Sequence, residues 1–486
     1  MIFRYIQYDY VINFFMTFRY MQYDYVIIGG GPCGLTLGWL LSQYKYKILI
    51  IEKESYIGGC HGVKRINNLF SEHGPRIYID NYYNFKEILK DMNINFYDIF
   101  VPYKFGINDF INSGIKNLNI TEIFILIFTF LKLNESYKKI SLLDYIKTHN
   151  FSQNAINYLD KICRLTDGGN IDKFTLYSFL QILNQNLLYQ IYQPKIPNDK
   201  GLFKLWYDKL IKNNVEIRIN NNINEIMIEN NNIKYIKSNN EIIYGAKFIL
   251  AIPPYQINEL LNKFNLKNIF MNNFNDFAIK TNYLTYIPIT FHWNKKIKIN
   301  TKWGLPESDW GIGHIVLSDY MIFNNCKSQT VISSLITKHD KSQYLNKTPN
   351  EINNKQIIID ETFRQLQLIL FNLPKYDYAI MSQNYYENNQ WKSLHTAFMT
   401  TKYGYVNNKS NIINNLYNCG VQNGKSNYSF TSMESAITNS ISLVHELIPE
   451  SKNKYLIKEI YTLREIIFIF LLLIIILCII YWHNRR

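Results

Sequence analysis

Three features of the sequence predict an α/β fold that carries a C-terminal transmembrane helix. A glycine-rich turn, Gly29 to Gly34, lies between two short apolar runs of strand composition. A second strand pattern that ends in glycine, residues 416–421, precedes a helical pattern near the C-terminus. The uncharged run 466–482 is apolar on every side, as a membrane-spanning helix must be.

The glycine turn stands in the order that a nucleotide-binding βαβ unit requires. Residues 25–28 form a short apolar strand pattern, and the turn follows at once. A helical pattern at 35–43 comes next, then a second strand pattern at 47–51, which ends in Glu52. This order predicts a parallel βαβ unit with the turn at the helix N-terminus.

Each glycine of the turn has a predicted task in binding a dinucleotide. Gly29 allows the tight turn, Gly31 lets a pyrophosphate approach the backbone, and Gly34 lets the helix pack closely on the sheet. The helix N-terminus offers N–H groups and partial positive charge to the phosphates. Glu52 would accept hydrogen bonds from ribose hydroxyls.

A second glycine pair favours FAD over NAD as the ligand. Gly58 and Gly59 follow Glu52 closely and would give a longer dinucleotide a second close passage of backbone. A separate NAD(P)H domain is disfavoured, because the pair Gly311 and Gly313 lacks the third glycine of such a turn.

With these motifs, the sequence resembles the FAD-dependent amine oxidase superfamily, which includes monoamine oxidases, protoporphyrinogen oxidases and phytoene-desaturase-like enzymes. Three further stretches carry the resemblance: 70–76 (FSEHGPR), closest to the protoporphyrinogen oxidase form, 201–254, and 416–421 with 431–436. In the family the last of these points a helix N-terminus at the flavin. The resemblance adds these cofactor-binding candidates: Gly74, Pro75, Arg76, Ile223, Gly420, Ser432 and Met433.

The resemblance also implies domains assembled from separate segments. The Rossmann-like FAD-binding domain would contain residues 21–85, 200–260 and 406–447, and an α+β substrate domain would contain 86–199 and 261–405. Residues 448–465 would be a linker to the anchor at 466–482. Residues 1–20 would be an extension, because FRYIQYDYVI at 3–12 recurs almost unchanged at 18–27; the working protein is expected to begin at Met16 or Met21.

The expected catalytic groups depart from those of monoamine oxidases. Thr290 stands where amine-oxidising members place a lysine, with Lys280 or Lys295 as alternative counterparts. Trp391 corresponds to a tryptophan near the flavin, but no cysteine follows it up to residue 405, so FAD is expected to be non-covalent. Ser432 replaces a tyrosine of the amine cage. The catalytic residues are therefore not identified by sequence, and Arg76, Trp391 and Lys280 are the candidates.

Three histidine and cysteine residues follow these glycine motifs. Cys60, His61 and His73 are expected near the ring, and each is more typical of a structural side chain than of a reactive group.

Composition excludes other classes of site. The net charge of +14 suits nucleic acid, an anionic cofactor or a membrane equally, and the excess of Tyr, Phe, Asn, Ile and Lys is typical of A/T-rich codons, so nucleic-acid binding is not expected. The six cysteines lack C-x-x-C spacing, which predicts neither a metal centre nor a disulfide framework and favours a reducing compartment.

The predicted function is a membrane-anchored FAD-dependent oxidoreductase that transfers a hydride from an amine, porphyrinogen or polyene-like substrate to flavin. One alternative is a flavin isomerase, since the chain through Tyr78 also resembles UDP-galactopyranose mutase; another is a membrane flavoprotein without turnover. The tail anchor would leave the catalytic body on the cytosolic side. The apolar run 120–133 is too short to span a bilayer easily and is expected as a core helix rather than a second membrane contact.

Overall fold

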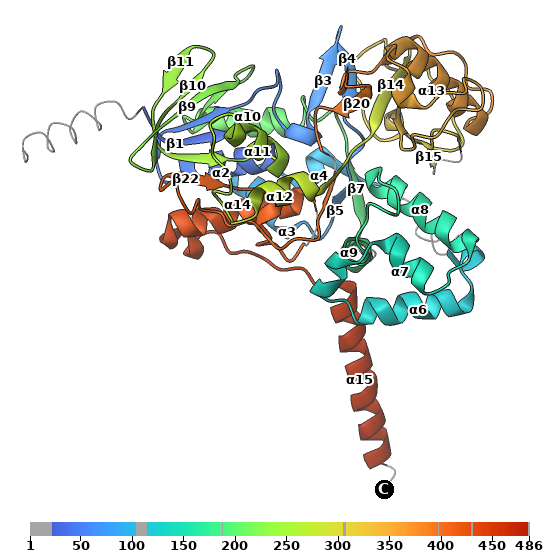
Figure 1. Ribbon diagram of the computed structural model, residues 1–486. Helices are drawn as coiled ribbons and strands as arrows, with labels where there is room; N and C mark the ends of the chain where they lie inside the picture. Colours follow the sequence, from blue (N-terminus) through green and yellow to red (C-terminus); the bar gives the residue numbers. More distant parts are fainter. Residues whose placement is uncertain are drawn as a thin grey trace, which may run out of the picture.

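The computed structural model describes residues 22–103, 114–186, 188–304, 308–396, 398–428 and 431–484. The predicted extension 1–20 lies outside the described residues. Figure 1 shows a large unit around a parallel sheet, a smaller unit with its own sheet, a group of helices, and one helix that projects away from them.

The central sheet is parallel, and its strands come from three distant parts of the chain. Their order is β22-β12-β1-β2-β8, and all four neighbouring pairs are parallel. The predicted α/β fold class is therefore confirmed. The strands are β1 (Tyr23–Ile28), β2 (Ile48–Ile51), β8 (Glu216–Arg218), β12 (Gly245–Leu250) and β22 (Leu416–Asn418).

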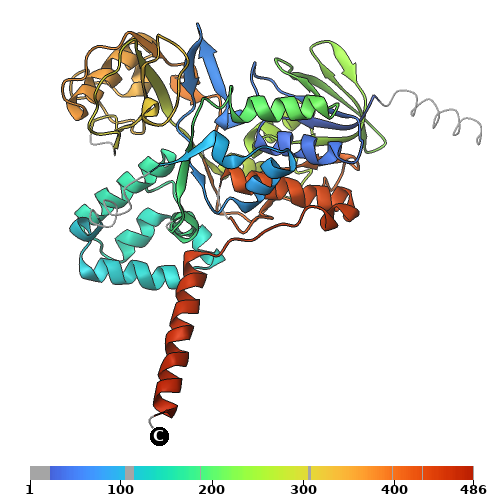
Figure 2. The ribbon, with the colours of Figure 1, turned by 180° about the vertical axis from the view of Figure 1, so that it is seen from behind.

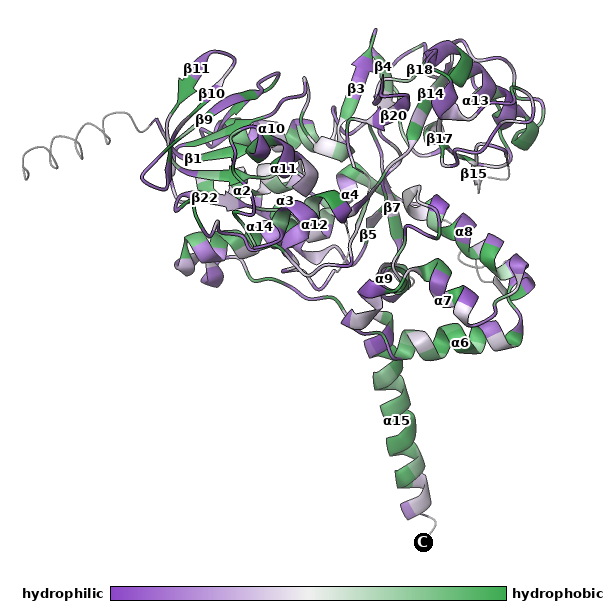
Figure 3. Ribbon diagram, in the orientation of Figure 1, coloured by the Kyte–Doolittle hydropathy of each residue, from purple (hydrophilic) through white to green (hydrophobic). Residues whose placement is uncertain are grey.

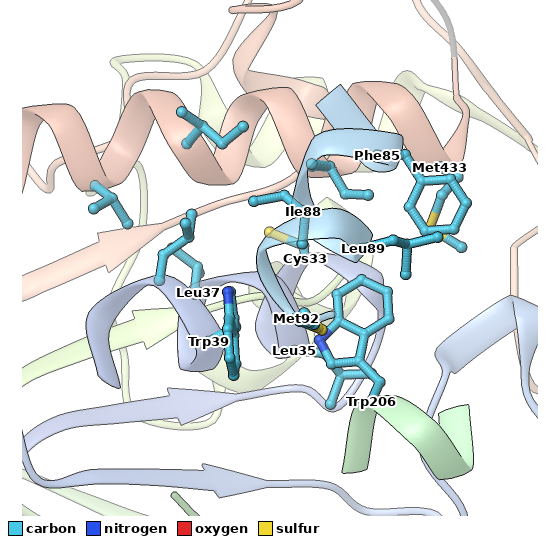
Figure 4. Packing of buried hydrophobic residues seen from close by; sticks show 14 of the residues in the cluster. Cys33, Leu35, Leu37, Trp39, Phe85, Ile88, Leu89, Met92, Trp206 and Met433 are labelled. Carbon is cyan, nitrogen blue, oxygen red and sulfur yellow. The ribbon is translucent and has the colours of Figure 1, made fainter. Parts of the chain in front are cut away.

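The inner part of the sheet is buried on both faces, which explains why a strand such as β2 is wholly apolar, whereas the edge strand β8 carries charged residues. Tyr25 and Ile27 of β1 belong to one core, whereas Val26 and Ile28 belong to the other. Figure 4 shows the first core, where Leu35, Leu37 and Trp39 of the first helix meet side chains of the helices around it. The helices of this core are α2 (Pro32–Ser42), α3 (Tyr83–Asp91), α4 (Phe96–Ile99), α10 (Leu202–Lys212) and α14 (Met433–Leu447). The second core is covered by β9 (Ile223–Glu229), β10 (Asn232–Ser238), β11 (Glu241–Ile243), α11 (Pro254–Asn262) and α12 (Phe274–Lys280).

The smaller unit contains a five-stranded antiparallel sheet of order β15-β16-β17-β14-β18. Helix α13 packs with this sheet in a separate apolar core. The elements are β14 (Ile287–Trp293), β15 (Trp303–Gly304), β16 (Ile312–Val316), β17 (Thr330–Ile336), β18 (Tyr378–Ile380) and α13 (Lys355–Ile369).

Short strands and turns connect the units. The strands are β3 (Val63–Ile66), β4 (Leu69–Glu72), β5 (Tyr78–Ile79), β6 (Phe100–Pro102), β7 (Ile191–Pro194), β13 (Asn282–Leu284), β19 (Asn384–Glu387), β20 (Gln390–Ser393) and β21 (Phe398–Thr400). The 3₁₀ turns are η1 (Gly59–His61), η2 (Glu135–Lys139), η3 (Leu317–Asp319), η4 (Pro349–Glu351), η5 (Val421–Asn423) and η6 (Pro449–Asn453).

The projecting helix α15 (Leu463–His483) contains the predicted anchor run 466–482. Thr462 and Glu465 form a reciprocal capping box at its start. Figure 3 shows that it is apolar along most of its length. Within the described part of the chain it is the one helix long and apolar enough to cross a membrane.

A second group of helices lies where α15 leaves the body, as the reverse view in Figure 2 also shows. It contains α6 (Ile120–Leu131), α7 (Leu142–Thr148), α8 (Gln153–Asp167) and α9 (Leu176–Asn186). The expectation that α6 is a core helix holds for one side only. Phe130 is buried in an apolar core, whereas Ile120, Phe124, Ile127 and Phe128 are exposed. The prediction rested on hydrophobicity, which does not show which side of a helix is packed. The buried residues of α6 are Glu122, Thr129 and Phe130.

Candidate cofactor and active site

The glycine turn has room for backbone only at two of its positions. Gly29 has φ +115°, and a Cβ there would lie 2.5 Å from the carbonyl oxygen of Ala251. A Cβ on Gly34 would lie 1.9 Å from the carbonyl oxygen of Gly29. Both glycines therefore hold the strand, turn and helix together.

Gly31 differs, because its Cβ position is open. The nearest heavy atom there would be the Cα of Gly59, at 3.8 Å, and the backbone of Gly31 is extended, with φ −78° and ψ −179°. Gly59 in turn has φ +55° and faces Gly31 across the gap. Two glycine backbones thus form a narrow cradle at the N-terminus of α2, where an anionic group can approach N–H donors.

Glu52 closes the end of β2 beside this cradle. Its Oε2 accepts a hydrogen bond of 2.7 Å from the N–H of Gly30, and its Oε1 accepts one of 2.9 Å from the N–H of Glu54. Burial raises the pKa of Glu52, while the two backbone donors act in the opposite direction. The carboxylate therefore fixes the turn and also borders the cavity described next.

One cavity of about 750 Å³ runs from the cradle into the smaller unit and the second helix group. Most of the predicted cofactor-binding residues line it: Gly29, Gly31, Glu52, Gly59, Pro75, Arg76, Ile223, Gly420, Ser432 and Met433. Gly34, Gly58 and Gly74 lie behind the wall, where they allow close packing; Gly58 packs against the ring of Phe203 and Gly74 against that of Tyr286. Residues from the N-terminal and C-terminal parts of the chain therefore line the same cavity.

The start of α14 forms the wall opposite the first turn. Ser432 is its N-cap and accepts a hydrogen bond of 3.0 Å from the N–H of Ser435. Glu434 points away from the cavity and accepts from the N–H groups of Asn84 and Phe85 at 2.8 and 2.9 Å. Burial raises the pKa of Glu434 to about 7. The carboxyl group thereby ties α14 to α3, while Ser432 and Met433 at the start of the helix line the cavity.

Arg76 lies in a cluster of polar rings on the cavity wall. It donates to the carbonyl oxygen of Cys60 at 3.2 Å and to Nδ1 of His73 at 2.6 Å. Because Nδ1 of His73 accepts, its Nε2 carries the proton and donates to Oγ1 of Thr285 at 3.0 Å. The tautomer of His73 is therefore fixed by its two partners.

The histidines of this cluster stay neutral at ordinary pH. Burial and the charge of Arg76 lower the pKa of His61 and of His73 well below the usual value. Burial lowers the pKa of His395 to about 3, and Nε2 of its ring lies 2.7 Å from the hydroxyl of Tyr56. Arg76 is thus the charged side chain beside these neutral rings, and its guanidinium favours the binding of an anionic group in the cavity.

Beyond Arg76 the cavity is lined by many aliphatic side chains, with Arg164, which pairs with Asp160, and His314 among them. Ile162 and Leu165 of α8, Ile182 and Leu183 of α9, and Leu335 of β17 line this part. Aliphatic side chains with a few polar groups among them are typical of a site for a small molecule.

Two catalytic candidates from the sequence do not lie on the cavity. Trp391 is buried in the core of the smaller unit, where its Nε1 donates to the carbonyl oxygens of Ile352 and Pro349 at 2.9 and 3.2 Å. Lys280 is exposed on α12 and pairs with Asp276 at 2.7 Å. Thr290 is buried inside β14 and does not line the cavity either. Their assignment followed an approximate match to family segments, which tertiary packing does not support.

Sequence reasoning missed His395 and Tyr56, which both approach the Arg76 cluster. His395 follows β20 in a connecting segment, and Tyr56 lies between Glu52 and the glycine pair. Neither stands in a motif with fixed spacing, so the sequence offers no signal for them beyond their proximity to Trp391 and Gly58.

Comparisons with known proteins agree with this architecture. Residues 27–92 match the family model of an NAD(P)-binding Rossmann-like domain. No curated protein matches the sequence at a significant level.

Several solved oxidases have a similar structure. A protein from Exiguobacterium sp. 255-15 assigned as a protoporphyrinogen oxidase is 12% identical, with a TM-score of 0.59 and coverage of 89% of this chain and 100% of that chain. A redesigned putrescine oxidase is 10% identical, with a TM-score of 0.60 and coverage of 89% and 100%. Cyclohexylamine oxidase from Brevibacterium oxydans IH-35A is 9% identical, with a TM-score of 0.59 and coverage of 87% and 99%. At these identities the likeness is one of fold, and the chain has the fold that these oxidases share.

Proposed function

We propose that this protein is a membrane-anchored FAD-dependent oxidoreductase that takes a hydride from an amine, a porphyrinogen or a polyene-like substrate. The observation that carries the proposal is the single cavity bordered by the glycine cradle, Glu52, Arg76 and the start of α14. Its apolar extension between α8, α9 and β17 would receive the substrate.

The residues around the cavity fit FAD. The cradle between Gly31 and Gly59 admits a diphosphate to backbone N–H groups, and Glu52 offers carboxylate oxygens to ribose hydroxyls. The cavity continues beyond Gly59 toward Arg76 and α14, which a longer dinucleotide would fill. When bound, FAD supplies the hydride acceptor.

The chain's own groups would bind, orient and exclude water. The start of α14 and the guanidinium of Arg76 would offer positive charge to the negative charge that develops on a bound flavin during reduction. The neutral rings of His61, His73 and His395 add hydrogen-bonding groups without adding charge. The apolar walls would hold the substrate carbon in a water-poor space.

The proposed FAD is non-covalent, and the proposed anchor is α15 with the body on the cytosolic side. Support for the first comes from residues 391–405, which contain no cysteine. Support for the second comes from the length and apolar surface of α15, and from the six cysteines, all free, as is usual in a reducing compartment.

The test is the visible spectrum of the full chain, purified in detergent, followed by dye reduction or peroxide release with amine, porphyrinogen and polyene substrates. A flavin spectrum with reduction by one substrate class supports the proposal. Colourless protein that binds no added FAD contradicts it. Conversion of a UDP-sugar by the dithionite-reduced protein would instead identify the isomerase, and bound flavin that no substrate reduces or converts would indicate a flavoprotein without turnover.

A further inference from the structure

Helix α6 packs Phe130 in an apolar core but leaves four other large apolar side chains exposed on its outward side. Its polar residues Glu122 and Thr129 are buried, whereas Ile120, Phe124, Ile127 and Phe128 are 66, 53, 48 and 60% exposed. The spacing of the exposed residues places them in one stripe along the helix, here called the α6 stripe. A contiguous apolar stripe that faces outward indicates a binding surface.

The polar groups on the packed side of α6 have hydrogen-bond partners within the protein. The carboxylate of Glu122 accepts from the N–H groups of Asn119 and Ser152, and the hydroxyl of Thr129 contacts that of Tyr145 on α7. The orientation of α6 is therefore fixed, and the α6 stripe faces away from α7. In Figure 1, α7 lies on the body side of α6, so the stripe faces the side toward which α15 projects.

The start of α15 is attached to the end of α6. The guanidinium of Arg464 donates to the carbonyl oxygen of Leu133, and the N–H of Arg464 donates to Oδ1 of Asn184 at 3.0 Å. Leu463 and Ile467 pack against the same apolar cluster as α6. Figures 1 and 2 both show α6 extending sideways from the upper end of α15. A bilayer that contains α15 would therefore begin at the level of the α6 stripe.

The chemistry of the stripe suits a lipid surface. Between 114 and 133 the exposed charged residues are Lys116 and Lys132, because Glu122 is buried. Aromatic and aliphatic side chains in the plane of a membrane, with lysines near their ends, are typical of interfacial helices. A soluble protein partner is not indicated, since α15 already brings a membrane to this side.

We propose that the α6 stripe is a second membrane contact, which inserts into the interfacial layer of the bilayer while α15 spans it. The proposal rests on the proposed anchoring by α15. The two attachments together hold the body in one orientation on the membrane, with the helix group that lines the apolar part of the cavity next to the lipid.

The test uses single nitroxide labels on the full FAD-loaded chain in phosphatidylcholine vesicles, with collision by oxygen and by a water-soluble nickel chelate. Labels are placed by Phe124→Cys and Phe128→Cys in a background that carries Cys326→Ser and Cys478→Ser, and Lys147→Cys on α7 is the matched control. Native Cys326 or Cys478, each kept as the only exposed thiol, gives the values for water and for the bilayer. Mass spectrometry confirms one label per chain.

We expect labels at 124 and 128 to collide more with oxygen than with nickel, as the label at 478 does, and labels at 147 and 326 to show the reverse. Preference for nickel at 124 and 128, with position 478 in lipid, would overturn the α6 contact but leave the anchor intact. Shielding from both reagents would indicate a protein contact and would also overturn it. A label at 478 that collides mainly with nickel would instead contradict the anchor itself.

Discussion

Replacement of Gly31 by alanine should separate cofactor binding from folding. The backbone of Gly31 is in a conformation that alanine adopts freely, and the added Cβ meets no atom closer than 3.8 Å. A glycine-to-alanine change at such a position stabilises a fold by roughly 0.4–1 kcal/mol, because it reduces the entropy of the unfolded chain. The melting temperature of the apoprotein should therefore stay the same or rise slightly.

Binding should respond in the opposite direction. The added methyl group occupies the cradle between Gly31 and Gly59, and it would keep a diphosphate from the N–H groups at the start of α2. Loss of one hydrogen bond to a charged group costs about 1.5–3 kcal/mol. The dissociation constant for FAD should then rise roughly 10- to 150-fold.

The assay is titration of apoprotein with FAD, followed by quenching of flavin fluorescence, together with a thermal melt in the absence of FAD. Gly34→Ala is the matched control, since its Cβ would lie 1.9 Å from the carbonyl oxygen of Gly29 and should lower the melting temperature strongly. Wild-type affinity in Gly31→Ala, or a fold lost without FAD, would refute the assignment of the cradle to the diphosphate.

Three further outcomes are expected. Acid precipitation of the holoprotein should release FAD into the supernatant, and a yellow pellet would show a covalent link. Burial, opposed by Arg76, raises the pKa of Glu72 from 4.5 to about 7; the folded protein therefore holds a proton there that the unfolded chain has lost, and stability should fall by about 3 kcal/mol as the pH rises through this window. Glu72→Gln should flatten the decline in melting temperature as the pH rises from 4.5 to about 7, leaving the part due to Glu434, and an unchanged slope would contradict this origin. Trp391→Phe should lower the free energy of unfolding by about 1–3 kcal/mol, because two buried carbonyl groups lose their donor, and it should leave the affinity for FAD unchanged. Lys280→Ala should alter neither quantity. Lower FAD affinity in either variant would contradict the position of that residue away from the cavity.

The first βαβ unit could be predicted from sequence because its signals are local. The strand expected at 25–28 spans Tyr23–Ile28, and the helix expected at 35–43 spans Pro32–Ser42. The helix expected to end near Leu447 does end there. In each case neighbouring residues specify the element through glycine, apolar period and capping.

The rest depended on contacts between distant residues. Trp391 and Lys280 were placed by approximate likeness to family segments, and a short shift in register moves a side chain to another face. The periodicity of α6 revealed an apolar helix but could not tell whether protein or lipid meets its apolar side. His395 joins the Arg76 cluster only through the folding of the smaller unit.

The carboxyl group of Glu434 bridges to Asn84 across 350 positions, and the hydroxyl of Ser440 reaches Cys33 across 407. During synthesis the N-terminal part of the chain emerges first, so β1 and α2 must wait for β22 and α14 before their pocket has all its walls. Until then, β1 and α2 expose apolar surface, which leaves the nascent chain vulnerable to aggregation. Under the proposed function, binding of the dinucleotide and insertion of α15 into the bilayer would both follow at this late stage of biogenesis.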